Sequence, residues 1–426
     1  MHDAAALQPA LARRHWIPPL GLAFGQLCHG LSWILALWIA LRLGVVGLSL
    51  AEIGWIHLVA LGWLTMTALS ILLHAIPSFL DVSWRFETAA RYALVFFGAS
   101  VAAFVFAFLA APTMLWLIAL AVALTLLVYL VTAAFTLGGA LRSPDRITKA
   151  VARAFAVTFL FFFIAIVLGA ASAWIFSELW RPTWLFALPP AHGSIALFGW
   201  LTLLIYGVSA RTLRPMTGNR SQWPMLHIVT GTATLIGAVL LAGGAAGRIP
   251  WLAWLGGGFL GAGALAYATD VTTILSGATV TYRVPQCFIG AAVGWLGVAL
   301  ALGAGVLAGM PWLGAFGFVM LAGWAGQMVN GHIFRIGVRL IATISRGDDD
   351  ETQPSELLDT RGPWIAFGAM QLAITCVTAG LVFQNAPAAT AGAALGLTGW
   401  FAIIASLVHA WSRAGVPRPT AQAQSF

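Results

Sequence analysis

Histidine is the residue type in this sequence best suited to chemistry, because its imidazole binds metals and transfers protons near neutral pH. Most of the nine histidines lie within or beside long apolar segments. An imidazole is costly inside a bilayer, so its presence there indicates a specific role. His57 and His192 stand six and eight residues before the tryptophan of a Gly-Trp pair in two similar segments, and His29 lies near the middle of another.

His57 and His192 are predicted to lie at a similar shallow depth, near the same face of the membrane. Two buried imidazoles that face one cavity could bind haem iron or copper. The alternative is a pair of hydrogen-bonded histidines that hold two helices together. Spacing alone leaves both interpretations open.

A second group of histidines is predicted near the other face. His74 follows His57 by seventeen residues, which is about 25 Å along a helix that rises 1.5 Å per residue. One prosthetic group therefore cannot be bound by both. We interpret this group as interfacial histidines that bond to loops or lipid headgroups: His74, His227, His332 and His409.

The elements that must position these side chains are membrane-spanning helices. Hydrophobic residues make up 61% of the 426 residues and charged residues 8%, whereas a soluble domain has about 25% charged residues. This composition excludes a soluble enzyme, a disordered protein and a nucleic-acid-binding protein. Cys28, Cys287 and Cys376 form no CxxC pair, so neither a disulfide framework nor a zinc site is expected. The first apolar run is full length, so no cleavable signal peptide is predicted.

A spanning helix needs about 20 apolar residues, and twelve segments of this kind are present. Tryptophans stand at or near many of their ends, as in the aromatic belts of membrane proteins. The predicted fold class is an all-α polytopic protein embedded in a lipid bilayer. The segments are 17–41, 53–77, 92–111, 113–140, 152–177, 184–210, 224–246, 251–277, 285–308, 313–343, 363–384 and 388–411.

The charges orient these segments. The tails and the loops after even-numbered segments contain 18 of the 21 lysines and arginines, and only Arg42, Arg181 and Arg248 lie on the other side. The positive-inside rule then places both termini in the cytoplasm, and we expect a bacterial inner membrane protein. The one sizeable soluble element is a cytoplasmic loop at 345–361, and a flexible tail is expected at 412–426.

The sequence also contains an internal repeat. Gly-Trp occurs at the centre of segments two, six and ten, and two of these copies share the sequence GWLT. Self-similarity at a fixed spacing indicates repeated structure, although small-residue packing also places glycine in membrane helices. We expect one transmembrane domain over 1–426 with three four-helix arcs. The pairs are Gly62-Trp63, Gly199-Trp200 and Gly323-Trp324, and the arcs are about 17–140, 152–277 and 285–411.

Three four-helix arcs, with a histidine early in segments two and six, resemble the subunit I superfamily of haem-copper oxidases. The similarity is greatest to cbb-type oxidases, nitric oxide reductases and the NnrS family linked to denitrification. The resemblance implies that His57 is an axial ligand of a low-spin haem b and that His192 matches a copper B ligand. It also implies a role in respiration or in nitric oxide or haem stress, with a respiratory complex or cytochrome as partner.

Several ligand positions of the superfamily hold other residues here. The stretch 241–246, LAGGAA, replaces a histidine pair late in segment seven, and Phe316 and Phe318 replace two histidines of segment ten. The chain therefore lacks a complete haem-copper centre, and copper is not expected. Met320 is a candidate second axial ligand beside the segment-two histidine, since His/Met ligation of haem occurs, and His29 is a further candidate.

Four functions remain open from the sequence. The first is a haem b-binding protein on the oxidase scaffold that lacks oxygen-reducing chemistry, with His57 and His192 as candidate metal-binding residues and the second axial ligand open. The second is an active oxidase or nitric oxide reductase with unusual ligands. The third is a transporter or metal permease, although the repeat is not inverted and few charges lie at mid-membrane. The fourth is a scaffold subunit without a cofactor.

Overall fold

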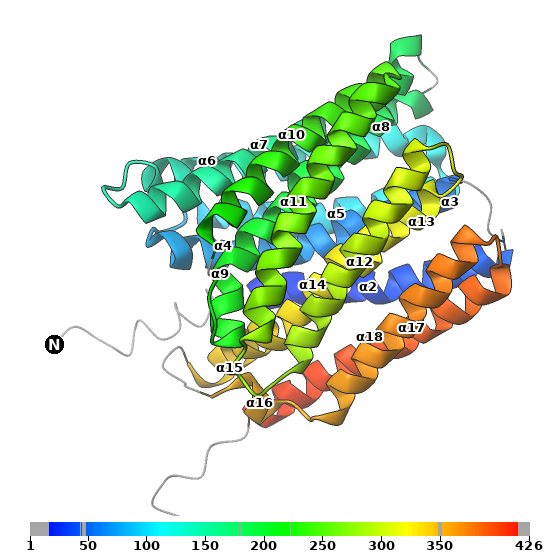
Figure 1. The fold of residues 1–426 in the computed structure, drawn as a ribbon. Helices are drawn as coiled ribbons and strands as arrows, with labels where there is room; N and C mark the ends of the chain where they lie inside the picture. Colours follow the sequence, from blue (N-terminus) through cyan, green and yellow to red (C-terminus); the bar gives the residue numbers. More distant parts are fainter. Residues whose placement is uncertain are drawn as a thin grey trace, which may run out of the picture.

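The fold is described by a computed structural model over residues 17–42, 44, 48–177, 179, 181–221, 223–347 and 352–415. This part of the chain is helical and contains no strand (Figure 1). Eleven of its helices are long and apolar enough to cross a membrane. The all-α, polytopic class is therefore confirmed. Three arginines of the two tails and the acidic run of the expected cytoplasmic loop lie outside the described residues: Arg13, Arg14, Arg418 and 348–351.

Most spans are single α-helices, and the others are interrupted by π-helical segments, in which hydrogen bonds join residues five apart. The single helices are α2 (Ile17–Arg42), α5 (Glu87–Ala110), α6 (Leu115–Ala140), α7 (Arg146–Ala173), α10 (Pro224–Gly247), α11 (Pro250–Ser276), α12 (Val284–Leu307), α17 (Arg361–Val382) and α18 (Ala386–Ala414). The interrupted ones are α3 (Leu50–His57), η1 (Leu58–Thr65) and α4 (Met66–Leu80); then η4 (Thr183–Ala187), α8 (Leu188–Ser194), η5 (Ile195–Thr202) and α9 (Leu203–Thr217); then α13 (Leu313–Phe318), η6 (Val319–Ala325), α14 (Gly326–His332), η7 (Ile333–Gly337) and α15 (Val338–Arg346).

The tenth expected span, 313–343, is not among the eleven membrane candidates. It forms the continuous run from α13 to α15, and the polar side chains of Gln327 and Asn330 lower its hydropathy. The expected loop at 345–361 overlaps the last two residues of α15 and the first of α17, and it contains a short helix, α16 (Pro354–Leu357). The last helix, α18, extends three residues into the expected tail, as far as Ala414.

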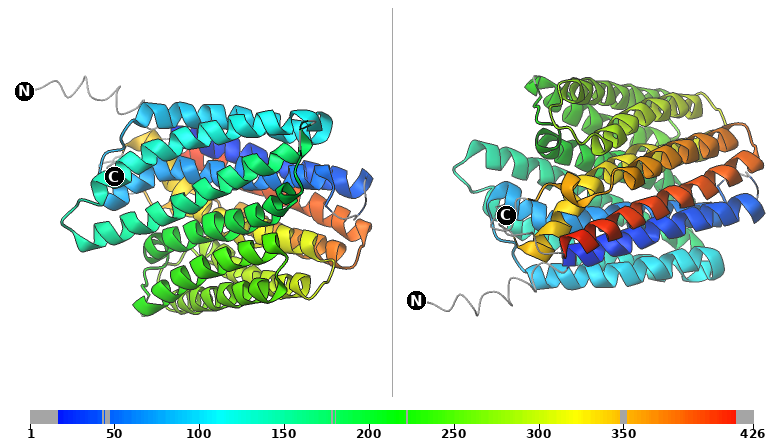
Figure 2. Two further views of the ribbon diagram at one scale, coloured as in Figure 1. Left: turned by 90° about the horizontal axis from the view of Figure 1, so that it is seen from above. Right: turned by 90° about the horizontal axis from the view of Figure 1, so that it is seen from below.

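The helices contact one another in an order that recurs along the chain. Hairpins form between α5 and α6, between α10 and α11, and between α17 and α18. Each hairpin's second helix contacts another helix beyond it: α6 contacts α7, α11 contacts α12, and α18 contacts α2. Figure 2 shows α18 beside α2, although these helices are the two ends of the described chain. The bundle therefore closes on itself.

Glycine allows the helices of one hairpin to approach closely. A β-carbon on Gly244 of α10 would lie 2.4 Å from the backbone nitrogen of Ala253 on α11. A β-carbon on Gly256 of α11 would lie 2.5 Å from the backbone nitrogen of Leu241. No larger residue fits at either position without moving a helix, which is how small residues tighten packing in membranes.

All three Gly-Trp pairs lie in π-helical segments, namely η1, η5 and η6. Two of the indoles donate hydrogen bonds to hydroxyls of the neighbouring π segment. Trp200 Nε1 lies 3.1 Å from Thr65 Oγ1, and Trp324 Nε1 lies 3.3 Å from Thr202 Oγ1. Each donor is buried, so these bonds link the three interrupted spans at the centre of the bundle.

The third indole breaks this pattern. In the two bonds above, the acceptor is a threonine two residues after the tryptophan of its own π segment. The equivalent acceptor for Trp63 would stand two residues after Trp324, where the sequence has Gly326. Trp63 Nε1 is buried and has no hydrogen-bond partner among the described residues. A β-carbon on Gly326 would lie 2.7 Å from Cη2 of Trp63. The Trp63 ring therefore occupies the space that a threonine at 326 would need.

Candidate functional site

His57 is held at the end of α3, directly before the π segment η1. The helix begins at a capping box: Ser49 Oγ accepts from Glu52 N at 3.3 Å, and Glu52 Oε2 accepts from Ser49 N at 2.6 Å. Two turns later, His57 Nδ1 lies 2.8 Å from the carbonyl oxygen of Ile53. Because a carbonyl only accepts, Nδ1 carries the proton and Nε2 keeps its lone pair.

Aromatic rings of α5 surround the His57 imidazole. Phe108 lies nearly parallel to it at a centroid separation of 5.2 Å and an interplanar angle of 21°. Phe104 presents an edge at the same centroid distance. Phe176 in turn packs edge-on against Phe108 at 6.3 Å. These rings give the imidazole an apolar wall and keep its orientation fixed.

His192 lies on α8 and takes its orientation from α7. Its Nδ1 lies 2.9 Å from the carbonyl oxygen of Ala165, so its Nε2 also keeps a lone pair. The start of α7 is fixed by Asp145, whose carboxylate accepts from Thr148 N at 2.7 Å. That hydrogen bond holds the pKa of the exposed Asp145 carboxyl below its usual range.

The two imidazoles lie side by side. Their ring centroids are 6.2 Å apart, and the ring planes differ by 4°. Each Nδ1 bonds to a backbone carbonyl, that of His57 within its own helix and that of His192 across to α7. The alternative of hydrogen-bonded histidines that hold helices together therefore stays open. Two metal–nitrogen bonds of about 2.0–2.1 Å, with roughly 1.1 Å from each nitrogen to its ring centre, would separate the centroids by about 6.3 Å. The observed centroid separation matches this value.

The donor pattern also fits a metal site. A metal-binding histidine typically donates its second ring N–H to a carboxylate or backbone carbonyl, which fixes the tautomer and raises ligand basicity. Both His57 and His192 show this pattern. The described residues contain no cluster of three or more His, Cys, Asp or Glu side chains that could hold an ion.

His29 lies apart from this pair. It is fully buried, and its ring stacks on Trp63 at a centroid separation of 3.5 Å and an interplanar angle of 5°. Its Nε2 accepts a hydrogen bond from Trp33 Nε1 at 3.1 Å. Its Nδ1 is buried without a partner among the described residues, as are the side-chain atoms of Gln26 and the hydroxyl of Thr67. The candidate cofactor role of His29 stays a prediction.

Met320 is buried in η6, in the main apolar core. Phe318, two residues earlier, packs against Trp55 at a centroid separation of 5.5 Å and against Trp33 at 6.2 Å. Aromatic packing thus fills the position at which the superfamily has a span-ten ligand. Nothing in the structure tests Met320 as an axial ligand, and that role stays a prediction.

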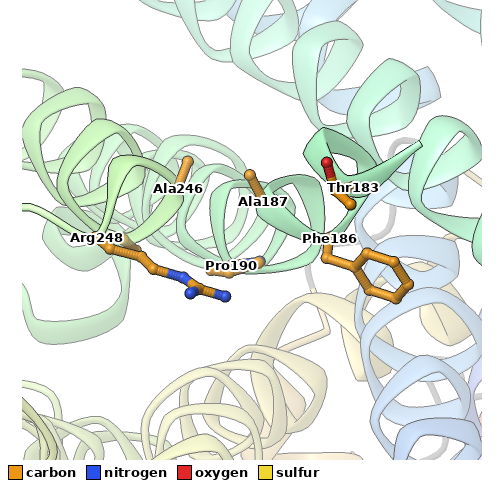
Figure 3. Close-up of a pocket in the computed structure, with 7 residues that line it drawn as sticks. Thr183, Phe186, Ala187, Pro190, Ala246 and Arg248 are labelled. Atoms are coloured by element: carbon orange, nitrogen blue, oxygen red, sulfur yellow. The ribbon is translucent and has the colours of Figure 1, made fainter.

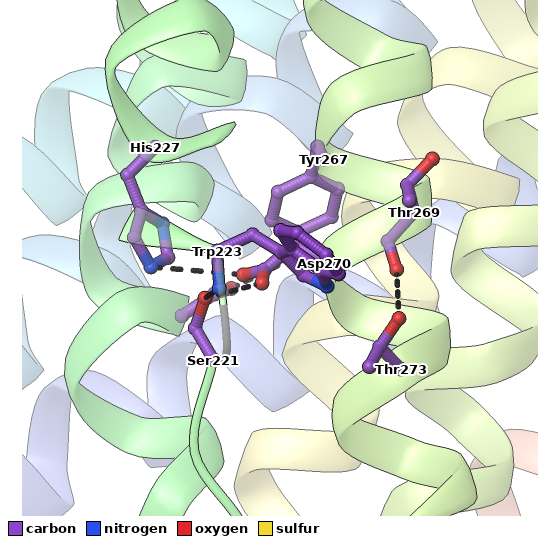
Figure 4. Close-up of polar contacts among 8 residues, drawn as sticks. Ser221, Trp223, His227, Tyr267, Thr269, Asp270 and Thr273 are labelled. Atoms are coloured by element: carbon purple, nitrogen blue, oxygen red, sulfur yellow. Dashed lines mark hydrogen bonds and ion pairs between the residues drawn. The ribbon is translucent and has the colours of Figure 1, made fainter. Parts of the chain in front are cut away.

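The inner histidines include two with specific partners. His332 Nδ1 lies 2.8 Å from Met328 O, and its Nε2 lies 2.8 Å from Thr212 Oγ1, so it joins α14 to α9. His227 Nε2 lies 3.6 Å from the carboxylate of Asp270, as Figure 4 shows. Asp270 is buried and also accepts from Ser221 Oγ at 2.5 Å. The sequence-based view of these two as interfacial residues missed these contacts between helices.

A cavity of about 330 Å³ opens beside the start of α8. It is lined by Phe186, Pro190 and the end of α10, and the Arg248 guanidinium extends along its rim toward Pro190 (Figure 3). Pro190 precedes His192 by two residues. This cavity is thus a hollow on the same end of the bundle as the histidine pair.

Sequence reasoning missed the residues that hold the pair in place. The carbonyl of Ala165 and the ring of Phe108 carry no sequence signal of their own, because a backbone acceptor or an apolar wall can come from any residue type. No family model matches this chain, and no curated protein matches it in sequence.

Proposed function

We propose that the chain forms twelve transmembrane spans in three four-helix arcs, with both termini in the cytoplasm of a bacterial inner membrane. The recurring helix contacts and the π-helical setting of every Gly-Trp pair support three equivalent units. The run α13–α15 brings the number of spans to twelve and is the tenth in chain order. It holds the place in its unit that α3–α4 and α8–α9 hold in theirs. The arginine-rich loops lie on the cytoplasmic side in this arrangement.

We propose further that the protein binds haem b, with His57 and His192 as the two axial ligands of one iron. The observation that carries this proposal is the parallel arrangement of the two imidazoles at 6.2 Å, each with Nδ1 on a backbone carbonyl. The superfamily resemblance alone would assign these histidines to different metal centres. Their proximity favours one shared centre.

A haem with both axial positions occupied by histidine supplies one-electron transfer when bound. The residues of this chain would hold its iron ligands rigid: Ile53 and Ala165 orient the imidazoles, and Phe104 and Phe108 exclude water from one side. The chain keeps no other histidine at the superfamily's copper B and active-site haem positions. We therefore propose electron transfer or sensing connected with respiration, nitric oxide or haem stress, rather than oxygen reduction.

Haem content tests this proposal. The wild-type protein, expressed with a haem precursor and purified in detergent, is expected to contain one b-type haem per chain by the pyridine haemochrome assay. His57→Ala and His192→Ala are each expected to lose most of it, whereas His227→Ala keeps it. A wild-type preparation that contains no haem after supplementation would overturn the proposal.

A further inference from the structure

The arginine-rich end of the bundle contains a cavity with a volume of about 570 Å³. It lies between the end of α9 and the run η7–α15, and the segment 352–354 forms a third wall. Protein cavities of this size hold small ligands. The lining includes Thr212, Met216, Arg335, Arg339, Thr352 and Gln353.

Two guanidinium groups supply the charge of this cavity. Arg335 Nη2 donates to the carbonyl oxygen of Pro215 at 3.1 Å, and Arg339 Nη1 donates to the carbonyl oxygen of Thr352 at 3.3 Å. Each guanidinium has five N–H donors, so most of them are not used by these bonds. Among the described residues, no carboxylate lies within ion-pair distance of either group. Two like charges one helical turn apart favour an anion between them.

The wall opposite these arginines is fixed in place. Thr352 is buried, and its Oγ1 accepts from Arg346 Nη1 at 2.8 Å. The same guanidinium donates from Nε to the carbonyl oxygen of Ala414 at 2.9 Å, which ties the wall to the end of α18. The cavity therefore has three sides that belong to separate elements and are joined by hydrogen bonds.

We propose that this cavity binds a phosphate group through Arg335 and Arg339. Guanidinium groups match the geometry of phosphate oxygens, and basic pockets between membrane helices on the cytoplasmic side bind anionic lipid headgroups. The same chemistry would recognise a soluble phosphate compound. The site does not depend on the haem proposal, because it lies at the other end of the bundle from His57 and His192.

Two parallel measurements distinguish the sources of the phosphate. Wild-type protein in phosphatidylcholine nanodiscs is titrated with inorganic phosphate by calorimetry. A second sample, in nanodiscs that also contain phosphatidylglycerol, is analysed by native mass spectrometry for lipid that stays bound. We expect saturable binding in at least one of these two measurements. The affinity should fall about tenfold or more in the Arg335→Gln/Arg339→Gln variant, because charge-assisted hydrogen bonds are lost.

Controls make each outcome decisive. Arg153→Gln removes an exposed arginine of α7 outside the cavity, and it should leave binding unchanged. Circular dichroism and gel filtration check that the double variant is folded, and Arg335→Lys/Arg339→Lys keeps the charge if it is not. Absence of binding in both arms, or equal binding in the double Gln variant, overturns the proposal. Binding that appears only after the acidic run 348–351 is changed to amides also overturns it for the native chain.

Discussion

Gly169 of α7 lies directly against the imidazole of His192: a β-carbon at Gly169 would come within 2.7 Å of Cε1 and 3.0 Å of Nδ1. Helix α7 therefore supplies both the space for this ring and, four residues earlier, the Ala165 carbonyl that orients it. One helix face thus determines where the His192 lone pair points.

Replacing Gly169 with alanine is expected to displace the His192 ring and to lower haem affinity about 10- to 100-fold, as loss of an orienting contact does at metal sites. Haem titration of the purified apoprotein measures this effect. Gly193→Ala is the matched control, because it is next to His192 and a β-carbon there meets no atom within 4 Å. Equal haem affinity in the two variants would contradict the prediction.

The bond between Trp200 and Thr65 should contribute to stability. Thr65→Val removes its acceptor and leaves a buried indole N–H unpaired, so we expect a loss of about 0.5–2 kcal/mol in the free energy of unfolding. Thr67→Val is the control, because the Thr67 hydroxyl is buried and already lacks a partner among the described residues. The free energies of unfolding of the two variants are compared in mixed micelles with increasing SDS. A Thr67→Val variant that is less stable than Thr65→Val would refute this expectation.

Gly326→Ala should destabilise the bundle, although alanine is normally the better helix residue. Its β-carbon would clash with the Trp63 ring at 2.7 Å, and overpacking of this kind costs about 1–3 kcal/mol. Gly317→Ala has open space around its β-carbon and should be neutral or stabilising. The melting temperature in detergent is the measurement, and a stabilised Gly326→Ala would show that the ring can move away.

The proposed orientation is tested with single cysteines introduced after Cys28, Cys287 and Cys376 are changed to alanine. Met310→Cys lies between α12 and α13, and Arg142→Cys follows α6. An impermeant maleimide should label the first in intact spheroplasts and the second only after permeabilisation. Labelling in the reverse order would invert the topology and place the arginine-rich cavity outside the cell.

The closeness of the histidine pair was accessible from the sequence, because both residues precede a Gly-Trp pair by similar distances. The two offsets differ by two residues, which is about 200° of rotation at 3.6 residues per turn. Side chains at identical positions of symmetry-related helices would have equivalent directions relative to the bundle axis. Despite this offset, the ring centroids of His57 on α3 and His192 on α8 lie 6.2 Å apart.

Other features had no sequence signal. Nothing in the sequence distinguishes a π-helical segment from an α-helix, so η1, η5 and η6 were not predicted. The stacking of the His29 ring on Trp63 depends on how α2 packs on η1, and the candidate ligand role of His29 stays a prediction. The segment 313–343 was predicted as an ordinary helix. Within the bundle, its Gln327 donates to the carbonyl oxygen of Ala322 and accepts from Gln371, whereas the polar side-chain atoms of Asn330 are buried without a partner among the described residues.

The absorption spectrum of haem-loaded protein, oxidised and reduced, tests the central claim most directly, because it reports the axial ligands of the iron. The wild type is expected to show a six-coordinate, low-spin b-type spectrum. His57→Ala and His192→Ala should each convert it to a five-coordinate, high-spin spectrum or abolish it. A His192→Ala spectrum identical to that of the wild type would contradict the account, since the second ligand would then be another residue.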